Sequence, residues 1–505
     1  MGVLPVLYPQ HSSDMTWREY HELTKHSVES LRRNPHYLDW ANMPDPFRHY
    51  EGVPILDLPA DPPSPQIPAL EVLEGKTGNT LAQDGAEFLS QLMFYSASIS
   101  ATKRVPSTGD TYALRVNPSS GNLHPTEFHF CTQGLAGWSD GLYHYRPSSH
   151  MAEQRAVGDF SGEVIETSAP LVFILTSIAW REAWKYRDRA YRYCLHDIGH
   201  AWQALTLAAR SIGCESFAHG HFPDDMVAKH CLLHEDEWPM LIVELRGPPI
   251  PVKISDPVET ILFGGQPNRL SDEQVPYPLI EQIHLATKLS KATMPSLGPS
   301  QPSGRGEISL PPNLSASPTF GHVVRVRRSA LDFRGGNESI SFARFAAILS
   351  TTTGPLFADF AAARFVQLYL YVHRVEGLAP GVYRYWPGHA ELEKIKEGDQ
   401  RLAAASLSLG QDLAGNACAA FSMIGDFESA ACRYGDRGYR YVHFEAGAIG
   451  QRMYLASEAL GLRATGIGAF FDDRVNRYLD LSPEQGQVVY HFAIGYPVPD
   501  PRLEA

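Results

Sequence analysis

The sequence predicts an α+β protein built from two tandem copies of one domain, each a mixed β-sheet flanked by helices. The first observation is an internal repeat, because the pattern YxDRxYRY at residues 186–193 recurs at residues 434–441, 248 positions later. The second is a Ser-, Pro- and Gly-rich stretch over residues 286–318, which has neither a helical nor a strand period. Two similar bodies joined by a linker follow from these observations.

Periodicity predicts the main elements of each copy. Short apolar or β-rich runs predict strands at residues 171–175, 240–243, 128–130 and 368–372. Long helices are expected at about 188–212 and 436–460, and the glycine after each, Gly213 or Gly461, is typical of a helix C-cap. Gly199 and Gly447 inside these helices each cost up to about 1 kcal/mol in propensity. We therefore expect a close backbone approach there, either to the facing helix or to a ligand.

The same segments divide the chain into four parts. We predict an N-terminal arm over residues 1–69, a first copy over 70–285, a linker over 286–318 and a second copy over 319–505. Tyr20, His21 and Trp40 suggest that the arm is a lid or a partner-docking segment.

Composition excludes several classes of function. The net charge of -13 argues against a general nucleic-acid binder, which needs a basic face. No uncharged apolar run approaches the ~18 residues of a membrane span, and the N-terminus lacks the order of a signal peptide. The 6 cysteines form no Cys-x-x-Cys pair, so we expect reduced, buried thiols and no metal site. The prediction is a cytoplasmic protein that binds neither nucleic acid nor membrane.

Three segments carry candidate binding residues. Pro118, Ser119, Ser120 and Asn122 lie in a loop whose hydroxyls and amide suit the ribityl chain or ring edge of a flavin, or form an ordinary polar turn. Arg327, Arg328 and Ser329 form either a phosphate clamp or a solvated basic run. Gly466, Ile467 and Gly468 would let the backbone approach a planar ring, although Gly-x-Gly alone is weak evidence.

Together these segments resemble the nitroreductase superfamily of FMN enzymes, and within it the SagB-type dehydrogenases, which include azoline oxidases. The Arg-Arg-Ser, Pro-Ser-Ser-Gly and Gly-Ile-Gly motifs of the superfamily resemble residues 327–329, 118–121 and 466–468. SagB-type motifs resemble Lys185-Tyr186, the RxYRY at residues 189–193 and the DxGH at residues 197–200. The resemblance spans residues 70–285 and 319–500, and it implies FMN as cofactor. Members of the family are usually homodimers, so the fused copies here imply an intramolecular pseudo-dimer that needs no second chain.

The two copies depart from the family in complementary ways. Alignment of the copies places residues 70–72, Leu-Glu-Val, where the second copy has Arg327, Arg328 and Ser329. It places residues 358–362 where the first copy has the Pro118 loop. We therefore expect one complete FMN site between the copies and one degenerate site. Leu331 stands where the family often has a second cation, which Lys103, Arg104 or Arg502 would have to supply.

The catalytic candidates implied by the resemblance are Lys185 and Tyr186. Removal of a proton from a substrate carbon needs a base beside the flavin, and an adjacent ammonium would lower the pKa of a tyrosine. The alternative is a surface lysine beside a core tyrosine. The second copy has Arg433-Tyr434 instead, which fits a site without that role.

These observations predict an FMN-dependent oxidoreductase that performs a two-electron oxidation or reduction of a small molecule or a peptide heterocycle, as an azoline dehydrogenase does. One alternative is a nitro- or quinone reductase that uses NAD(P)H as electron donor. Another is a non-catalytic scaffold in a peptide-modifying complex.

Overall fold

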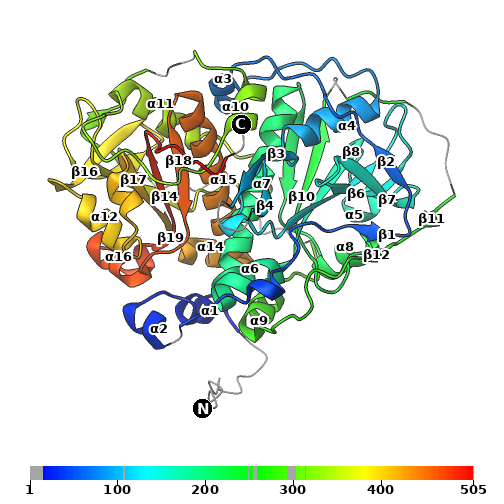
Figure 1. The fold of residues 1–505 in the computed structure, drawn as a ribbon, viewed down its shortest axis with the longest axis horizontal. Helices are drawn as coiled ribbons and strands as arrows, with labels where there is room; N and C mark the ends of the chain where they lie inside the picture. Colours follow the sequence, from blue (N-terminus) through cyan, green and yellow to red (C-terminus); the bar gives the residue numbers. More distant parts are fainter. Residues whose placement is uncertain are drawn as a thin grey trace.

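The computed structural model describes residues 15–503 except 34, 106–108, 248–249, 254–258, 293–302, 313 and 315. Two lobes lie side by side, and the long helices α7 (Ala190–Ser211) and α15 (Gly438–Ala459) pack against each other between them (Figure 1). Each lobe holds one copy of the repeat, built around one large sheet. The predicted α+β class with two tandem copies is therefore confirmed.

Each copy has one large antiparallel sheet. The first sheet has the order β11-β7-β6-β5-β8-β10-β9 with β2 beside β7, and the second has the order β13-β16-β15-β14-β17-β19-β18. The first contains β2 (Ile55–Asp57), β5 (Thr126–Thr132), β6 (Gly141–Arg146), β7 (Met151–Val157), β8 (Leu171–Ser177), β9 (Glu215–His219), β10 (Trp238–Arg246) and β11 (Ile261–Leu262). The second contains β13 (Ile308–Ser309), β14 (Val366–Val372), β15 (Gly381–Trp386), β16 (Glu391–Glu397), β17 (Ala419–Gly425), β18 (Arg463–Ile467) and β19 (Gln487–Gly495).

The sheets differ from the mixed sheets that the sequence predicts, because every described pair of these strands is antiparallel. The physical reason is local. Short turns join β5 to β6 to β7, and likewise β14 to β15 to β16, whereas parallel neighbours need long crossovers.

The remaining elements cover the sheets and join the copies. The helices besides α7 and α15 are α1 (Trp17–Leu23), α2 (Val28–Arg33), α3 (Ala69–Glu74), α4 (Gly85–Phe94), α5 (Ser161–Val164), α6 (Ala179–Tyr186), α8 (Asp224–His230), α9 (Pro278–Thr287), α10 (Phe320–Val326), α11 (Phe342–Thr352), α12 (Arg401–Leu407), α13 (Asp412–Asn416), α14 (Phe427–Tyr434) and α16 (Asp472–Tyr478). Two small pairs, β1 (Tyr50–Glu51) with β12 (Gln266–Pro267) and β3 (Ile99–Arg104) with β4 (Thr111–Arg115), stand apart from the sheets. Among the described helices, none has the length and apolar content that a membrane crossing requires.

The four predicted strands and two predicted long helices occur close to their expected positions, as β8, β10, β5, β14, α7 and α15. Gly213 and Gly461 follow α7 and α15 with φ of 94° and 73°, which is the left-handed region that a C-cap glycine supplies. Of the cysteines, Cys432 is exposed and the other five are buried.

The close approach expected at Gly199 and Gly447 is to the facing helix. A Cβ atom added to Gly199 would lie 2.8 Å from the Cα of Gly447, so α7 and α15 cross with almost no space between their backbones. The two glycines therefore hold the copies together rather than contact a ligand directly.

Reciprocal ion pairs join the copies where α7 and α15 begin, at the same end of the two helices. Asp472 of the second copy pairs with two arginines of the first, and Asp224 of the first pairs with the two corresponding arginines of the second. The N···O distances are 3.0 Å for Arg189–Asp472, 2.9 Å for Arg192–Asp472, 2.8 Å for Arg437–Asp224 and 2.9 Å for Arg440–Asp224. All six side chains are buried, so each carboxylate neutralises guanidiniums that no solvent reaches.

A short helix precedes each ion-pair cluster. Thr24 follows α1 and accepts a hydrogen bond from Arg192 Nε at its hydroxyl, at 3.0 Å. Thr287 ends α9 and accepts one from Arg440 Nε in the same way, at 2.9 Å. Tyr20 and His21 of α1 are fully buried here, whereas Trp40 is 67% exposed. Tyr20 and His21 thus pack at the join between the copies, and the lid or partner-docking role of the arm stays a prediction.

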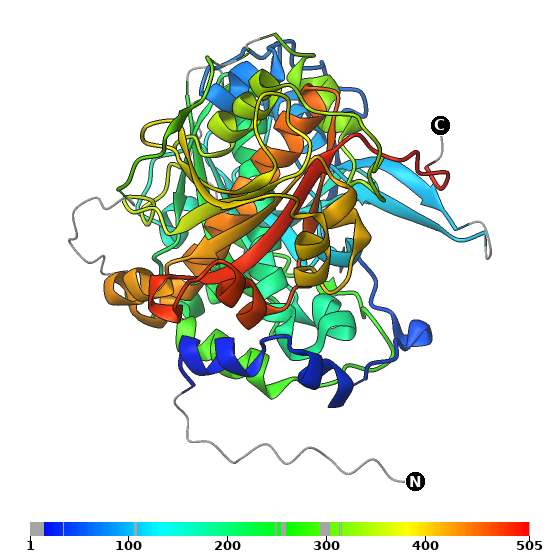
Figure 2. The same ribbon diagram turned by 90° about the vertical axis from the view of Figure 1, so that its left-hand side faces the viewer.

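The linker and the C-terminal segment each lie against a strand. Of the predicted linker, residues 293–302, 313 and 315 lie outside the described part, and β13 within it pairs with β16. The β3–β4 hairpin extends from the body of the protein, and the C-terminal segment lies beside it (Figure 2). The predicted domain boundaries stay predictions.

Candidate functional site

The loop at residues 117–124 has a backbone that few residue types adopt. It follows β4, and Gly121, Asn122 and His124 have φ of 59°, 62° and 50°. Gly and Asn tolerate this region best, which explains their place in the sequence. Ser119 Oγ accepts a hydrogen bond from the His124 backbone N–H at 2.7 Å, and Asn122 Nδ2 donates to the Ala113 carbonyl at 3.0 Å. The loop is thus held by its own side chains.

A buried carboxylate of α7 anchors this loop. Asp197 accepts hydrogen bonds from the backbone N–H and the hydroxyl of Ser120, each at 3.1 Å. Ser119 Oγ lies 3.5 Å from Glu182 of α6, so two acidic side chains stand behind the two serines. Pro118 begins the tight turn and is half-buried.

Lys185 and Tyr186, at the end of α6, both lie against Gly121. A Cβ atom on Gly121 would be 2.8 Å from the Tyr186 hydroxyl and 3.1 Å from Lys185 Nζ, so this position needs glycine. Lys185 Nζ lies 5.3 Å from the centre of the Tyr186 ring. The two catalytic candidates therefore share one small volume with the loop although they are neighbours in a helix.

The adjacent lysine led us to expect a lowered pKa for Tyr186, but the pKa of Tyr186 is not lowered. Burial raises it well above its ordinary value, and the nearby Glu182 carboxyl raises it further. Tyr186 is therefore a neutral hydrogen-bond donor at pH 7 in this structure.

The Arg-Arg-Ser segment of the second copy is bound to the first copy. Arg327 donates to the Arg115 carbonyl at 3.1 Å, just before the Pro118 loop. Arg328 donates to the carbonyl of Ser100 in β3 at 2.9 Å. The Ser329 hydroxyl lies 2.8 Å from the hydroxyl of Tyr454 in α15. Both guanidiniums are buried against the β3–β4 hairpin, so the clamp and the loop belong to one interface.

The Gly-Ile-Gly segment completes this interface. The Gly466 N–H donates to the Tyr454 hydroxyl at 2.9 Å, and the Gly468 carbonyl accepts from the Tyr193 hydroxyl at 2.9 Å. A Cβ atom on Gly468 would overlap the Tyr193 ring, so the missing side chain allows the copies to touch. The Ile467 side chain, in contrast, is buried in the core of the second copy.

Several residues at this interface were not among the predicted site residues. The Tyr193 ring lies 4.4 Å from that of Tyr186, and His196 stacks on Tyr490 at 4.3 Å with an interplanar angle of 8°. Tyr193 and Asp197 belong to motifs that the sequence shows, but nothing in the pattern indicates Tyr490 or Tyr454, because their roles depend on a strand and a helix of the other copy.

The buried acids beside the loop have raised pKa values. Burial raises the pKa of Asp197 to about 7, against the lowering effect of its hydrogen bonds from Ser119 and Ser120. Burial and the neighbouring Asp197 raise the pKa of Glu182 well above its ordinary value. Two neighbouring carboxyls with raised pKa values are typical of a site that holds or transfers a proton.

This pair predicts a pH-dependent loss of stability. Between the ordinary Asp pKa of about 4 and about 7 the folded chain binds more protons than the unfolded chain, so the free energy of unfolding falls as pH rises, by at most about 1.4 kcal/mol per pH unit for one proton. Asp197→Asn should flatten this fall between pH 5 and 7.5, measured by chemical denaturation. Asp473→Asn, an exposed control, should leave the slope unchanged, and equal slopes in wild type and Asp197→Asn would contradict the assignment.

The interface also holds buried polar atoms that lack a partner among the described residues. They include Asn117 Oδ1, Arg327 Nε and both ring nitrogens of His196. Unpaired buried polar groups are costly, so their presence at one interface fits a polar ligand that would satisfy them. The residues present thus fit FMN, which carries a phosphate, a ribityl chain and a planar ring.

The expected second cation is paired with an acid. Lys103 Nζ lies 2.8 Å from Asp500, and Arg502 Nε lies 2.8 Å from the same carboxylate. Arg104 is exposed, and Leu331 is 45% exposed. Because the single Asp500 carboxylate pairs with both Lys103 and Arg502, one net positive charge remains near the β3–β4 hairpin, which carries Ser100.

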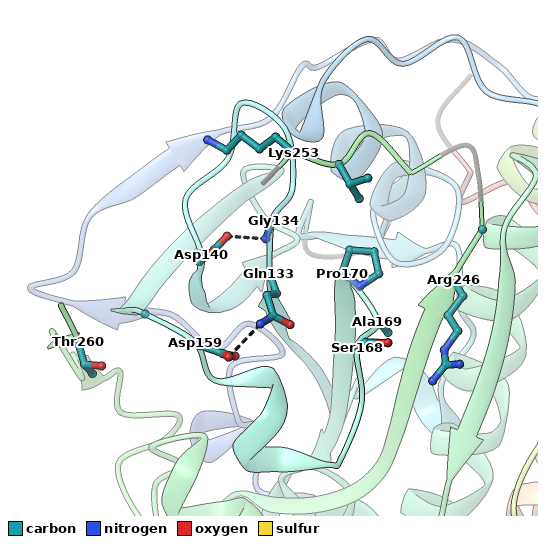
Figure 3. Close-up of a pocket in the computed structure, with 13 residues that line it drawn as sticks. Gln133, Gly134, Asp140, Asp159, Ser168, Ala169, Pro170, Arg246, Lys253 and Thr260 are labelled. Carbon is teal, nitrogen blue, oxygen red and sulfur yellow. Dashed lines mark hydrogen bonds between the residues drawn. The ribbon is translucent and has the colours of Figure 1, made fainter. Parts of the chain in front are cut away.

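A cavity of about 820 Å³ lies elsewhere, at one edge of the first copy (Figure 3). Its polar groups bond to one another, since Gln133 Nε2 donates to Asp159 at 2.9 Å and the Gly134 N–H donates to Asp140 at 2.7 Å. No residue of the second copy lines it, so it is separate from the predicted site residues.

Comparisons with known proteins agree with the repeat. A model described as "Nitroreductase family" matches residues 100–245 and 327–496. MJ1384 of Methanocaldococcus jannaschii, a candidate nitroreductase, is 32% identical over 116 residues, which cover 23% of this chain and 59% of that protein. The microcin B17-processing protein McbC of Escherichia coli is 30% identical over 146 residues, or 26% of this chain and 54% of McbC. The chain thus spans a little over half the length of these two curated relatives.

A solved structure extends the likeness to both copies. The crystal structure of a candidate nitroreductase from Anabaena variabilis is 27% identical to this chain, with a TM-score of 0.76. The match covers 95% of this chain and 99% of the other, so the two chains share the whole two-copy architecture.

Proposed function

This chain belongs to the nitroreductase family, and from that premise we propose that it is an FMN-dependent oxidoreductase of the SagB type. Its reaction would be a two-electron oxidation or reduction of a small molecule or a peptide heterocycle, such as an azoline. The likeness to McbC and to the trifolitoxin operon protein TfxC of Rhizobium leguminosarum supports the peptide-heterocycle class. Because the matched regions are partial, substrate and partners are part of this proposal.

The observation that carries the proposal is the meeting of two segments from different copies. Arg327 bonds to the carbonyl of Arg115, two residues before the 117–124 loop, and the loop in turn reaches Lys185 and Tyr186 through Gly121. The segment proposed to bind the phosphate and the loop proposed to bind the ring thus meet across the interface.

FMN, when bound, would supply the two-electron chemistry. Arg327, Arg328 and Ser329 would hold its phosphate, since guanidiniums and a hydroxyl match phosphate oxygens. Ser119, Ser120 and Asn122, with Pro118 fixing the turn, would hold the ribityl chain and ring edge. The backbone of Gly466, Ile467 and Gly468 would face the ring, because glycine permits that approach.

Lys185 and Tyr186 would take part in proton transfer to or from the substrate. Since Tyr186 is neutral, it would donate a hydrogen bond or a proton toward the substrate in the direction of reduction. Asp197 and Glu182 lie behind the loop and would store a proton near that hydroxyl.

The second copy would have no comparable flavin site. At the position of the 117–124 loop it has residues 358–362, where Asp359 accepts the Gly220 N–H at 2.9 Å and Phe360 stacks on Tyr441 at 4.4 Å. The segment at residues 70–72 offers no guanidinium.

We therefore expect one FMN per polypeptide. Reconstitution with excess FMN, followed by gel filtration and absorbance of the released flavin, measures this ratio. Two FMN per chain would refute the single site, and no FMN uptake would favour the non-catalytic scaffold. As a control, Arg328→Gln should lower the ratio, whereas Arg477→Gln on the exposed face of α16 should not.

The alternative within enzymes is an NAD(P)H-dependent nitro- or quinone reductase. Such a reductase would use the same flavin pocket for the nicotinamide. Rapid anaerobic bleaching of the flavin by NADH or NADPH would favour it, whereas bleaching by an azoline substrate would favour the dehydrogenase.

A further inference from the structure

A second cavity, of about 500 Å³, lies between the two copies. Thr206 and Arg210 of α7 and Arg452 of α15 line its inner wall, so both copies contribute. Phe217 and Phe357, which are 37% and 49% exposed, lie at its open side. The cavity therefore has a polar interior and an aromatic rim.

The repeat identifies this cavity as the counterpart of the proposed flavin site. At the offset of 248, Thr206 corresponds to Tyr454, whose hydroxyl lies beside Ser329. Arg210 corresponds to Glu458, and Arg452 corresponds to Ala204. Compared with the proposed flavin site, this cavity lacks a bulky phenol and an acid and has two additional guanidiniums. Its free volume and its charge therefore both differ.

The inner wall of the cavity has hydrogen-bond donors without a partner among the described residues. Arg452 is 1% exposed; its Nε donates to Gln203 at 2.8 Å and its Nη2 donates to the Pro355 carbonyl at 2.9 Å. Its Nη1 is buried and has no partner in the described part of the chain, and the same holds for the hydroxyl of Thr206. Arg210 is 8% exposed and donates to the Val72 carbonyl at 3.2 Å.

No acid of the described chain neutralises these guanidiniums. Burial, with a smaller effect of the nearby Arg210 and Arg364, lowers the pKa of Arg452 to about 9, and no carboxylate acts against this shift. Of the acids that line the cavity, Glu74 and Glu215 are exposed, and Glu244 already bonds to Arg246 at 3.0 Å. Two buried cations without a counter-ion are costly, and an anion would offset that cost.

We propose that this cavity binds a small ligand with an oxyanion head, a carboxylate or phosphate group, on an apolar body. The head would contact Arg452, Arg210 and Thr206, since guanidinium donors match planar or tetrahedral oxyanions. The body would lie against Phe217 and Phe357. The ligand is separate from the FMN of the proposed site, because the residues proposed to hold that FMN lie at the other interface.

The test uses the FMN-loaded full chain with phenyl phosphate and benzoate as probes, which differ only in the head group. At least one probe should bind in calorimetry and raise the melting temperature. Arg452→Gln should weaken that probe about tenfold or more, because one charge-assisted donor is lost. The stronger probe identifies the head group. Thr206→Val, a nearly isosteric change, should weaken binding independently if Arg452→Gln folds poorly.

The controls separate this site from the flavin clamp. Arg477→Gln should bind the probe like wild type, and Arg452→Gln should keep one FMN per chain. Binding of neither probe would overturn the proposal, as would a probe whose affinity is unchanged in both Arg452→Gln and Thr206→Val. Loss of probe binding in Arg328→Gln but not in Arg452→Gln would place the anion at the flavin clamp and overturn it equally.

Discussion

Replacement of Asp472 by alanine is expected to lower the free energy of unfolding by about 3–5 kcal/mol. The carboxylate is 2% exposed and pairs with Arg189 at 3.0 Å and Arg192 at 2.9 Å. It also accepts the backbone N–H of His26 at 2.8 Å, which ties the N-terminal arm to both copies. Without it, two buried guanidiniums keep only neutral acceptors such as Thr24, and the cost of burying their charge is no longer offset.

Chemical denaturation, followed by both tryptophan fluorescence and circular dichroism, measures the effect. Asp473→Ala is a matched control. The Asp473 carboxylate is exposed and pairs with Lys25, so we expect the free energy of unfolding to change by less than about 1 kcal/mol. Asp224→Ala should repeat the effect of Asp472→Ala in the reciprocal ion-pair cluster. A small effect in both buried variants would show that the arginines find other partners.

Replacement of Tyr186 by phenylalanine is expected to slow turnover by about tenfold or more while leaving FMN bound. The Tyr186 hydroxyl lies against Gly121 and beside the Lys185 ammonium, but the residues proposed to hold FMN donate through other groups. Single-turnover reduction of the flavin by substrate isolates the step in which the proton moves.

The second copy offers a matched control for this variant. Tyr434 occupies the same position of the repeat, yet its hydroxyl lies 3.4 Å from the Phe360 carbonyl at the interface without a flavin clamp. Tyr434→Phe should therefore turn over like wild type. Equal rates in Tyr186→Phe and wild type would remove Tyr186 from the proton-transfer step, and a change of FMN content would assign it to cofactor binding instead.

The elements predicted best are those with a strong local pattern. The apolar runs that became β8 and β10 and the periodic segments that became α7 and α15 depend on neighbours within one or two turns. The direction of the strands was predicted less well, because strand pairing depends on how the connections run. The burial of Tyr20 could not be predicted for a similar reason, since nothing near it in sequence reveals that Tyr191 and Tyr439 pack against its ring.

The sequence by itself determined that this chain has two copies of one domain, and that each copy carries a different half of the candidate flavin motifs. Only the tertiary structure decided that Arg189 binds Asp472 while Arg437 binds Asp224, because a repeat shows the same residues twice but not which copy they face. It also decided that the pKa values of Tyr186, Asp197 and Glu182 are raised, because a pKa depends on burial and on neighbours brought together by folding. The motifs are local, whereas desolvation and charge pairing are properties of the assembled interface.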